Sequence, residues 1–217
     1  RAPLADVLES GLAVQLGGAA GTLSALGDDG VRVVDALARE LELAVPTLPW
    51  HTNRVRVAEL GTALATVAGV CGKIGLDVVL LSQTEVGEVR EAAGGGSSAM
   101  PQKRNPVKAT LARSCGALAG SHASVLRHSL VQEHQRAAGA WHAEWEALCG
   151  VLGFTGGAAA AAARPLRPGY AACCNSHALA LAFARIGRGG IVGRLIGAGG
   201  LDLQRGAAVR RVPSDCH

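Results

Sequence analysis

The sequence predicts an all-α protein built as a bundle of long helices. Hydrophobic residues make up 49% of the chain and aromatic residues only 3%, so the core has to consist of Ala, Leu and Val. Such a composition favours closely packed helices over a β-sandwich. From Val55 to Val89 there is no proline, and apolar residues recur every three or four positions. This periodicity indicates a helix of about thirty residues, which is typical of a bundle or an oligomer seam.

The residues before the long helix predict shorter elements. Residues 2–16 are expected to end a helix, and a glycine-rich run follows over residues 17–27. Such a run either lets two helices approach closely or brings backbone amides to a ligand. It lacks the strand, loop and helix setting of a dinucleotide-binding fingerprint. Asp28 or Asp29 can cap the next helix, whose apolar face carries Val31, Val34, Leu37 and Leu41.

Three glycines lie inside the long helix at three-residue spacing, namely Gly69, Gly72 and Gly75. Each costs the helix up to about 1 kcal/mol relative to alanine, so we expect a partner helix to pack closely there. Toward Val89 the segment Gln83-Thr84-Glu85 is polar. It is either a solvated face or the floor of a binding site.

The stretch from Gly94 to Pro106 reads Gly-Gly-Gly-Ser-Ser-Ala-Met-Pro-Gln-Lys-Arg-Asn-Pro. It combines glycine flexibility with many hydrogen-bond donors and contains no carboxylate, which suits an anionic substrate. The alternative is a solvated linker between two helices. Asn105 can cap a helix and Pro106 fits its first turn, so we expect free backbone amides of that helix to point back toward the loop. Its apolar residues are Val107, Leu111, Leu118 and Val125.

A second polar cluster covers residues 132–136 and is followed by Trp141-His142-Ala143-Glu144-Trp145. The two tryptophans are four residues apart and therefore lie on one helical face. They are either large apolar anchors at a helix start, or part of a site in which Arg136 and nearby histidines face a polyanion.

Charge and cysteine usage limit the classes of function. The net charge of +4 is spread along the chain, so no nucleic-acid partner is expected. The six cysteines show no metal-type spacing, which favours reduced thiols in a cytoplasmic protein. No signal peptide is recognisable, and charges such as Lys73 and Asp77 interrupt the apolar segments, so no membrane span is expected. The chain begins without methionine, and we expect it to be a piece of a longer protein.

Residues 96–106, Gly-Ser-Ser-x-Met-Pro-x-Lys-x-Asn-Pro, resemble the signature loop of the fumarase/aspartase superfamily. Within that superfamily, residues 48–54, 83–89 and 132–145 look like the bacterial cycloisomerases that act on 3-carboxy-cis,cis-muconate. The resemblance covers about residues 14–153. It implies that residues 1–163 form the central helical bundle domain, whereas residues 164–217 depart from the family pattern and are expected to be an atypical, poorly ordered tail.

The resemblance also implies a chemistry. Ser97 matches the residue that transfers a proton at the carbon α to a carboxylate, in a reaction that lactonises 3-carboxymuconate to 4-carboxymuconolactone in protocatechuate (β-ketoadipate) catabolism. Two arginines, Arg54 and Arg136, are candidates to clamp the remaining carboxylates of a small polycarboxylate substrate. No metal or organic cofactor is implied. The expected substrate-binding residues of the loop are Ser98, Met100, Lys103 and Asn105.

Members of the superfamily are homotetramers whose active sites are each assembled from three subunits. A family segment with a Thr-His pair, which supplies an acid/base histidine, is expected before Arg1. Two alternatives remain open at this point. One is another lyase of the superfamily, such as adenylosuccinate lyase, and the other is a non-catalytic helical assembly fragment.

Overall fold

The computed structural model describes residues 3–91, 95–135 and 137–163, and in these ranges the fold is all-α as predicted. The predictions for residues 164–217 lie outside the described residues. Three long helices dominate, and shorter helical segments precede them. The elements are α1 (Pro3–Asp6), η1 (Val7–Gly11), η2 (Ser24–Asp29), α2 (Gly30–Leu41), α3 (Val55–Leu81), α4 (Val107–His128) and α5 (Ala140–Ala163).

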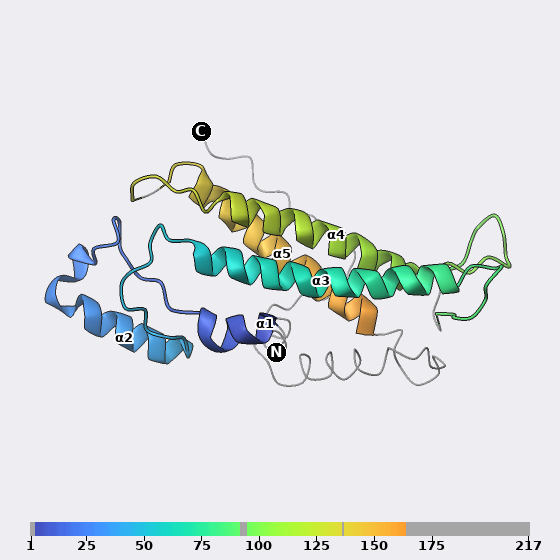
Figure 1. The fold of residues 1–217 in the computed structure, drawn as a ribbon, viewed down its shortest axis with the longest axis horizontal. Coiled ribbons are helices and arrows are strands. Elements are labelled where there is room, and N and C mark those ends of the chain that lie inside the picture. Colours follow the sequence, from blue (N-terminus) through green and yellow to red (C-terminus); the bar gives the residue numbers. More distant parts are fainter. Residues whose placement is uncertain (1–2, 92–94, 136, 164–217) are drawn as a thin grey trace.

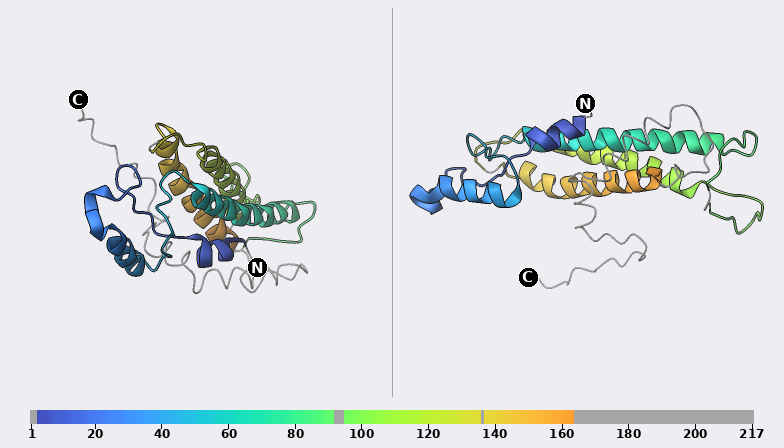
Figure 2. Two further views of the ribbon diagram at one scale, coloured as in Figure 1. Left: turned by 60° about the vertical axis from the view of Figure 1, so that its left-hand side comes forward. Right: turned by 90° about the horizontal axis from the view of Figure 1, so that it is seen from below.

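The three long helices form an antiparallel bundle in which α4 runs back along α3 and α5 returns along α4 (Figure 1). Each of them packs against the other two, and two further views show the same side-by-side arrangement (Figure 2). Small residues fill most of the shared core, together with a few larger side chains that are almost fully buried. These are Leu64, Cys71, Leu126 and Val151.

Two glycines let α3 and α4 approach closely. A Cβ atom at Gly75 would lie 2.5 Å from the Ala109 carbonyl oxygen, and one at Gly116 would lie 2.8 Å from the Ala68 carbonyl oxygen. The expected close packing is therefore confirmed at Gly75. At Gly72 the contact with α4 would be an ordinary one, and at Gly69 the described residues leave the space open.

The long helix begins at Val55 as predicted but ends at Leu81, so its predicted extension to Val89 is wrong. The chain folds back on the helix end instead, because the amides of Glu88 and Val89 both donate to the Leu81 carbonyl, at 3.0 and 3.2 Å. Gly87 has a φ of 64°, a conformation that glycine adopts at little cost. The turn thus satisfies a carbonyl that a helix end leaves unpaired.

The helix α4 has two different faces. Its buried face consists of Ala109, Ala112, Ala119, Ala123 and Leu126. The larger apolar residues, which recur at helical spacing in the sequence, are 38–53% exposed within this chain. We call them the outer stripe: Val107, Leu111, Leu118 and Val125.

The N-terminal part packs around a small core of Val14, Val34 and Ala38. The predicted helix after the glycine-rich run is confirmed as α2, although Val31 and Leu41 of its predicted apolar face are exposed. Asp29 holds the N-cap position of α2 without a side-chain cap hydrogen bond. The predicted helix over residues 2–16 ends earlier, at Gly11.

Two helices, α3 and α5, are long and apolar enough to span a membrane by length and composition alone. The core helices of a soluble bundle meet the same criterion, and both helices pack against α4 here. The C-terminal half of α3 also carries an exposed ion pair between Lys73 and Asp77, which hydrocarbon would disfavour.

Candidate functional site

The predicted signature loop is a compact loop closed at its base. Gly95 and Asn105 exchange two backbone hydrogen bonds, of 2.9 and 2.8 Å. Inside the loop, the Met100 amide donates to the Ser97 hydroxyl oxygen at 3.2 Å, and the Lys103 amide donates to the Met100 carbonyl at 2.9 Å. These bonds form two successive turns, the first from Ser97 to Met100 and the second from Met100 to Lys103.

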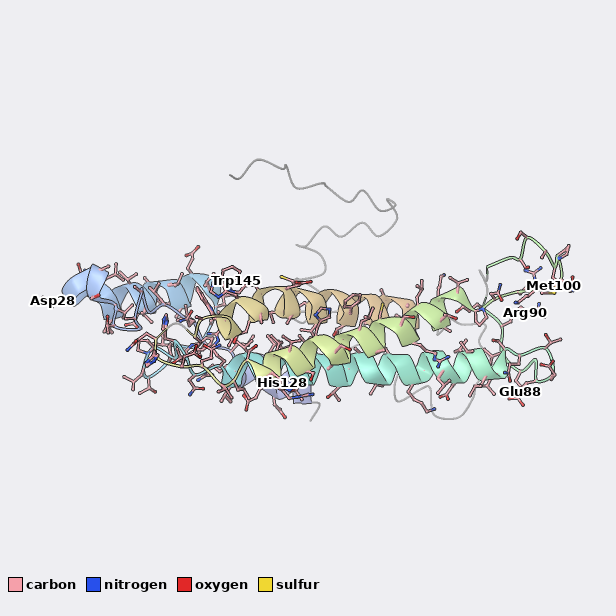
Figure 3. All side chains as sticks on the ribbon, turned by 90° about the horizontal axis from the view of Figure 1, so that it is seen from above. Asp28, Glu88, Arg90, Met100, His128 and Trp145 are labelled. Carbon is pink, nitrogen blue, oxygen red and sulfur yellow. The ribbon has the colours of Figure 1, made fainter. Side chains whose placement is uncertain are left out.

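The loop residues differ in exposure. Ser97 and Asn105 are half-buried, whereas Ser98, Met100 and Lys103 are exposed. The structure therefore brings all five predicted loop residues together in one segment. The exposed polar patch at residues 83–85 lies at the same end of the bundle, since Glu88 and Arg90 lie beside the loop that carries Met100 (Figure 3). The two predicted arginines are not part of this group.

Arg54 lies at the start of α3, whereas the loop follows the other end of that helix. A helix of 27 residues spans about 40 Å at 1.5 Å per residue, which is too far for Arg54 and Ser97 to meet on one small substrate. Figure 3 shows the separation, because Trp145 in the second turn of α5 and Met100 lie toward opposite ends of the molecule. Arg136 lies outside the described residues.

The first turn of α4 differs from the prediction. Pro106, rather than Asn105, occupies the N-cap position, and it makes no side-chain cap hydrogen bond. The carboxylate of Glu91 accepts hydrogen bonds from the amides of Ala109 and Lys108, at 2.8 and 3.3 Å. The Val107 amide donates to the Asn105 carbonyl at 2.9 Å. The expectation of free amides pointing at the loop is therefore wrong, because the chain itself occupies them.

At the opposite end, Arg54 and Glu144 form a nearly buried ion pair whose side chains are 10% and 3% exposed. The Arg54 Nε atom lies 3.0 and 2.9 Å from the two carboxylate oxygens, and Nη2 lies 2.6 Å from Oε2. Gln132 donates a further bond to Oε1 at 3.1 Å. Within the chain this guanidinium therefore has a two-pronged carboxylate partner, and its predicted role as a substrate clamp stays a prediction.

A pocket of about 200 Å³ lies beside this ion pair. The Gln15 amide nitrogen lies 3.3 Å from His51 Nδ1. Arg54 Nη1 also donates to the His51 carbonyl at 3.4 Å. The pocket lining is Gln15, Leu16, Gly17, Gly18, His51, Thr52, Gln132, Gln135 and Trp141.

The glycine-rich run contributes to this pocket rather than to helix packing. A Cβ atom at Gly17 would lie 3.1 Å from His51 Nδ1, so the absence of a side chain makes room for the imidazole. Gly17 and Gly18 line the pocket, and the interpretation that the run brings backbone amides to a ligand stays a prediction. Gln15 and Thr52 were not singled out from the sequence; the only signal was their position next to the glycines and next to His51.

The two tryptophans meet as their spacing predicts. The rings of Trp141 and Trp145 are 5.2 Å apart in an edge-on arrangement, and the His142 ring lies 5.0 Å from that of Trp145. Trp141 also lines the pocket, whereas Trp145 is 55% exposed. An aromatic wall thus borders a pocket lined by neutral hydrogen-bonding groups.

The two ends of the bundle offer different chemical groups. The loop provides a hydroxyl group, an ammonium and, at Arg104, an exposed guanidinium. The pocket provides an imidazole, three amide side chains and a hydroxyl group. Among the described residues, no group of three or more His, Cys, Asp or Glu side chains is placed to hold a metal ion.

The chain is similar to a known protein family and to individual enzymes. The model of the family described as Lyase matches residues 2–119. The chain is 52% identical over 164 residues to 3-carboxy-cis,cis-muconate cycloisomerase of Bradyrhizobium diazoefficiens, with 74% of this chain and 36% of that protein covered. It is 49% identical over 163 residues to nitrosuccinate lyase of Streptomyces davaonensis, with 70% and 34% covered.

Solved structures of enzymes are also similar to this chain. The 3-carboxy-cis,cis-muconate lactonizing enzyme of Pseudomonas putida superposes with a TM-score of 0.61 at 37% identity, over 89% of this chain and 47% of that one. A fumarate lyase from Mesorhizobium sp. BNC1 superposes with a TM-score of 0.59 at 35% identity, over 71% and 34%. The chain spans about a third of the length of the curated relatives that it matches.

Proposed function

Because the chain belongs to the lyase family of the fumarase/aspartase type, we propose that it provides the central part of a cycloisomerase for 3-carboxy-cis,cis-muconate. The product is 4-carboxymuconolactone, an intermediate of protocatechuate catabolism. The observation that carries the proposal is the closed loop in which two successive turns contain Ser97 and Lys103. The proposed substrate is accordingly a small polycarboxylate, and the place of action is the cytoplasm.

In the proposed reaction, a substrate carboxylate oxygen bonds to one carbon of a C=C double bond. The π electrons move to the other carbon, which is α to a second carboxylate and takes a proton from Ser97 Oγ. A serine alkoxide needs strong stabilisation at neutral pH. The Met100 amide donates to Ser97 Oγ at 3.2 Å, and the ammonium group of Lys103 is proposed as the second stabilising group.

The site is proposed to form between copies of the chain. The loop supplies the proton donor and the cation, whereas the pocket around His51 supplies neutral donors for the remaining carboxylates, and the two lie at opposite ends of the bundle (Figure 3). The outer stripe on α4 supports association, because solvent-exposed apolar rows on a helix are covered in stable assemblies. The proposed assembly is a homotetramer in which the loop of one copy meets the pocket of another.

A hybrid enzyme tests the proposed activity. In it, this chain replaces the matching segment of the Bradyrhizobium diazoefficiens cycloisomerase, so that the remaining two thirds of the enzyme are present. We expect the hybrid to consume 3-carboxy-cis,cis-muconate, measured as loss of the diene absorbance. A folded tetrameric hybrid that leaves this substrate untouched would overturn the proposal.

Parallel assays separate the alternatives. The similarity to nitrosuccinate lyase favours that reaction as the second candidate, and adenylosuccinate tests for the activity of another superfamily lyase. A hybrid with Ser97→Ala is the control for catalysis by the loop. If the wild-type hybrid consumed none of the three substrates, the chain would be a non-catalytic helical element.

A further inference from the structure

Glu91 is a buried carboxylate that the proposed reaction does not use. It is 7% exposed and lies in the segment between α3 and the loop. Its oxygens accept hydrogen bonds from the amides of Ala109 and Lys108, which are 18 and 17 residues further along the chain. A buried carboxylate is costly unless such bonds compensate it, so this arrangement constrains the fold strongly.

Glu91 takes the place of a local cap. Helix N-termini are normally capped by a Ser, Thr, Asp or Asn side chain next to the first turn, but α4 has Pro106 at that position. A carboxylate at this point pairs with the unsatisfied amides and with the positive end of the helix dipole. The capping group of α4 is therefore supplied from the opposite side of the loop.

This placement links the segment before the loop to the segment after it. Glu91 precedes the loop, and Ala109 follows it. The bond between them and the backbone pair of Gly95 with Asn105 are two successive cross-links at the loop base. The segment that carries Ser97 and Lys103 is thus attached to α4 through both of its ends.

We infer that Glu91 is a positioning residue, which fixes the Ser97 loop on the first turn of α4 and keeps the amides of that turn from binding the substrate carboxylates. The side chains of the loop, and not these amides, then bind the substrate carboxylates. The link to catalysis rests on the proposed function, whereas the mechanical role of Glu91 does not.

Amide hydrogen exchange on the chain itself tests the mechanical role. In Glu91→Gln, we expect the amides of Lys108 and Ala109 and those of residues 95–105 to exchange at least about tenfold faster, because a neutral acceptor holds the helix start less strongly. The α5 amides stay unchanged. Glu88→Gln, which alters an exposed carboxylate in the same segment, leaves all rates as they are. Equal exchange in wild type and Glu91→Gln would overturn the inference.

Two further measurements keep the test decisive. If Glu91→Gln unfolds, Glu91→Asp keeps the charge on a shorter side chain, and we expect faster exchange confined to the loop and the first turn of α4; a uniform increase would count against positioning. In the hybrid enzyme, we expect Glu91→Gln to lower kcat about tenfold or more with KM changed less than threefold. Faster exchange together with an inactive wild-type hybrid would refute the proposed function alone.

Discussion

At the residue scale, the molecule depends on carboxylates that pair with groups far away in the sequence. Glu144 holds Arg54 across 90 residues, and Glu91 holds the start of α4 across the whole loop. Neither contact has a local sequence signal, because each partner is ordinary in its own segment. The order of residues in the loop could be recognised from the sequence, whereas these supporting contacts could not.

Removal of Glu144 provides a stability test. Glu144→Ala leaves a guanidinium that is only 10% exposed without its carboxylate, and breaking a buried pair in this way costs about 3–5 kcal/mol. We expect a large fall in the free energy of unfolding, measured by urea denaturation with circular dichroism. The matched control is Glu146→Ala, which removes an exposed carboxylate of the same helix. Equal midpoints for the two variants would show that the ion pair contributes little.

Thiol reactivity tests the core of the bundle. Burial raises the pKa of the Cys71 thiol to about 11, and burial also raises the pKa of Cys115, whereas Cys149 is exposed. At pH 8 we expect Cys149 to be alkylated at least about a hundredfold faster than Cys71, measured by peptide mass spectrometry. Comparable labelling of the two thiols in the folded chain would contradict the bundle core.

The raised pKa of Cys71 also has a consequence for stability. The pKa of the thiol in the unfolded chain is near the ordinary value of 9.0, so the unfolded thiol ionises before the folded one, whose pKa is about 11. The folded state therefore binds the thiol proton more tightly than the unfolded state does. The resulting contribution to the free energy of unfolding is complete below pH 9 and declines as the pH rises toward 11. We expect the urea midpoint to fall over that window and to fall less in Cys71→Ala. Parallel profiles for the two proteins would contradict this linkage.

At the element scale, the spacing of apolar residues predicted α3 and α4, whereas for α5 the sequence indicated only a possible helix start near Trp141. The α3 pattern faces the core, as expected, since Leu64, Cys71 and Val78 are buried. The α4 pattern faces outward, because alanines and glycines provide the close contact with α3. The composition predicted a core of small residues. The larger apolar residues of α4 nevertheless lie on the face that is exposed in the single chain, so their spacing does not identify the buried face.

Paired glycine substitutions test the contact between α3 and α4. A methyl group at Gly75 would meet a carbonyl oxygen at 2.5 Å, so Gly75→Ala forces the helices apart at a cost of about 1–3 kcal/mol. Gly69→Ala meets open space and is expected to stabilise α3 by up to about 1 kcal/mol. Thermal unfolding of the two variants gives the comparison. Shifts of the same sign would show that Gly75 is not a contact point.

At the scale of the whole molecule, the loop that carries Ser97 and the pocket around His51 lie at opposite ends of one chain. The sequence predicted a site at the loop, with Arg54 and Arg136 as candidate clamps, but it did not predict the pocket around His51. It could not show their separation, because that depends on the length of α3 and on the antiparallel return of α4. The resemblance implied shared active sites, and the geometry of the single chain gives the physical reason why sharing is required for the proposed reaction.

Association through the outer stripe can be tested without an activity assay. Leu118→Lys places a charge in the middle of the stripe, where the side chain is 44% exposed, so the single chain tolerates it while a packed interface does not. We expect the hybrid enzyme with this change to remain helical and to lose its tetramer in light scattering. Arg127→Glu, an exposed change on the same helix, serves as the control. An intact tetramer in Leu118→Lys would place the interface elsewhere.

The central claim is that the Ser97 loop of one copy works on a substrate held in the His51 pocket of another. Its most direct test mixes two inactive hybrid enzymes, Ser97→Ala and His51→Asn, under conditions in which subunits exchange. If the two half-sites come from different copies, random mixing restores roughly a quarter of the wild-type turnover, because that share of sites combines an intact loop with an intact pocket. If both half-sites worked within one copy, every site in the mixture would keep one defect, and the mixture would stay as inactive as its parts.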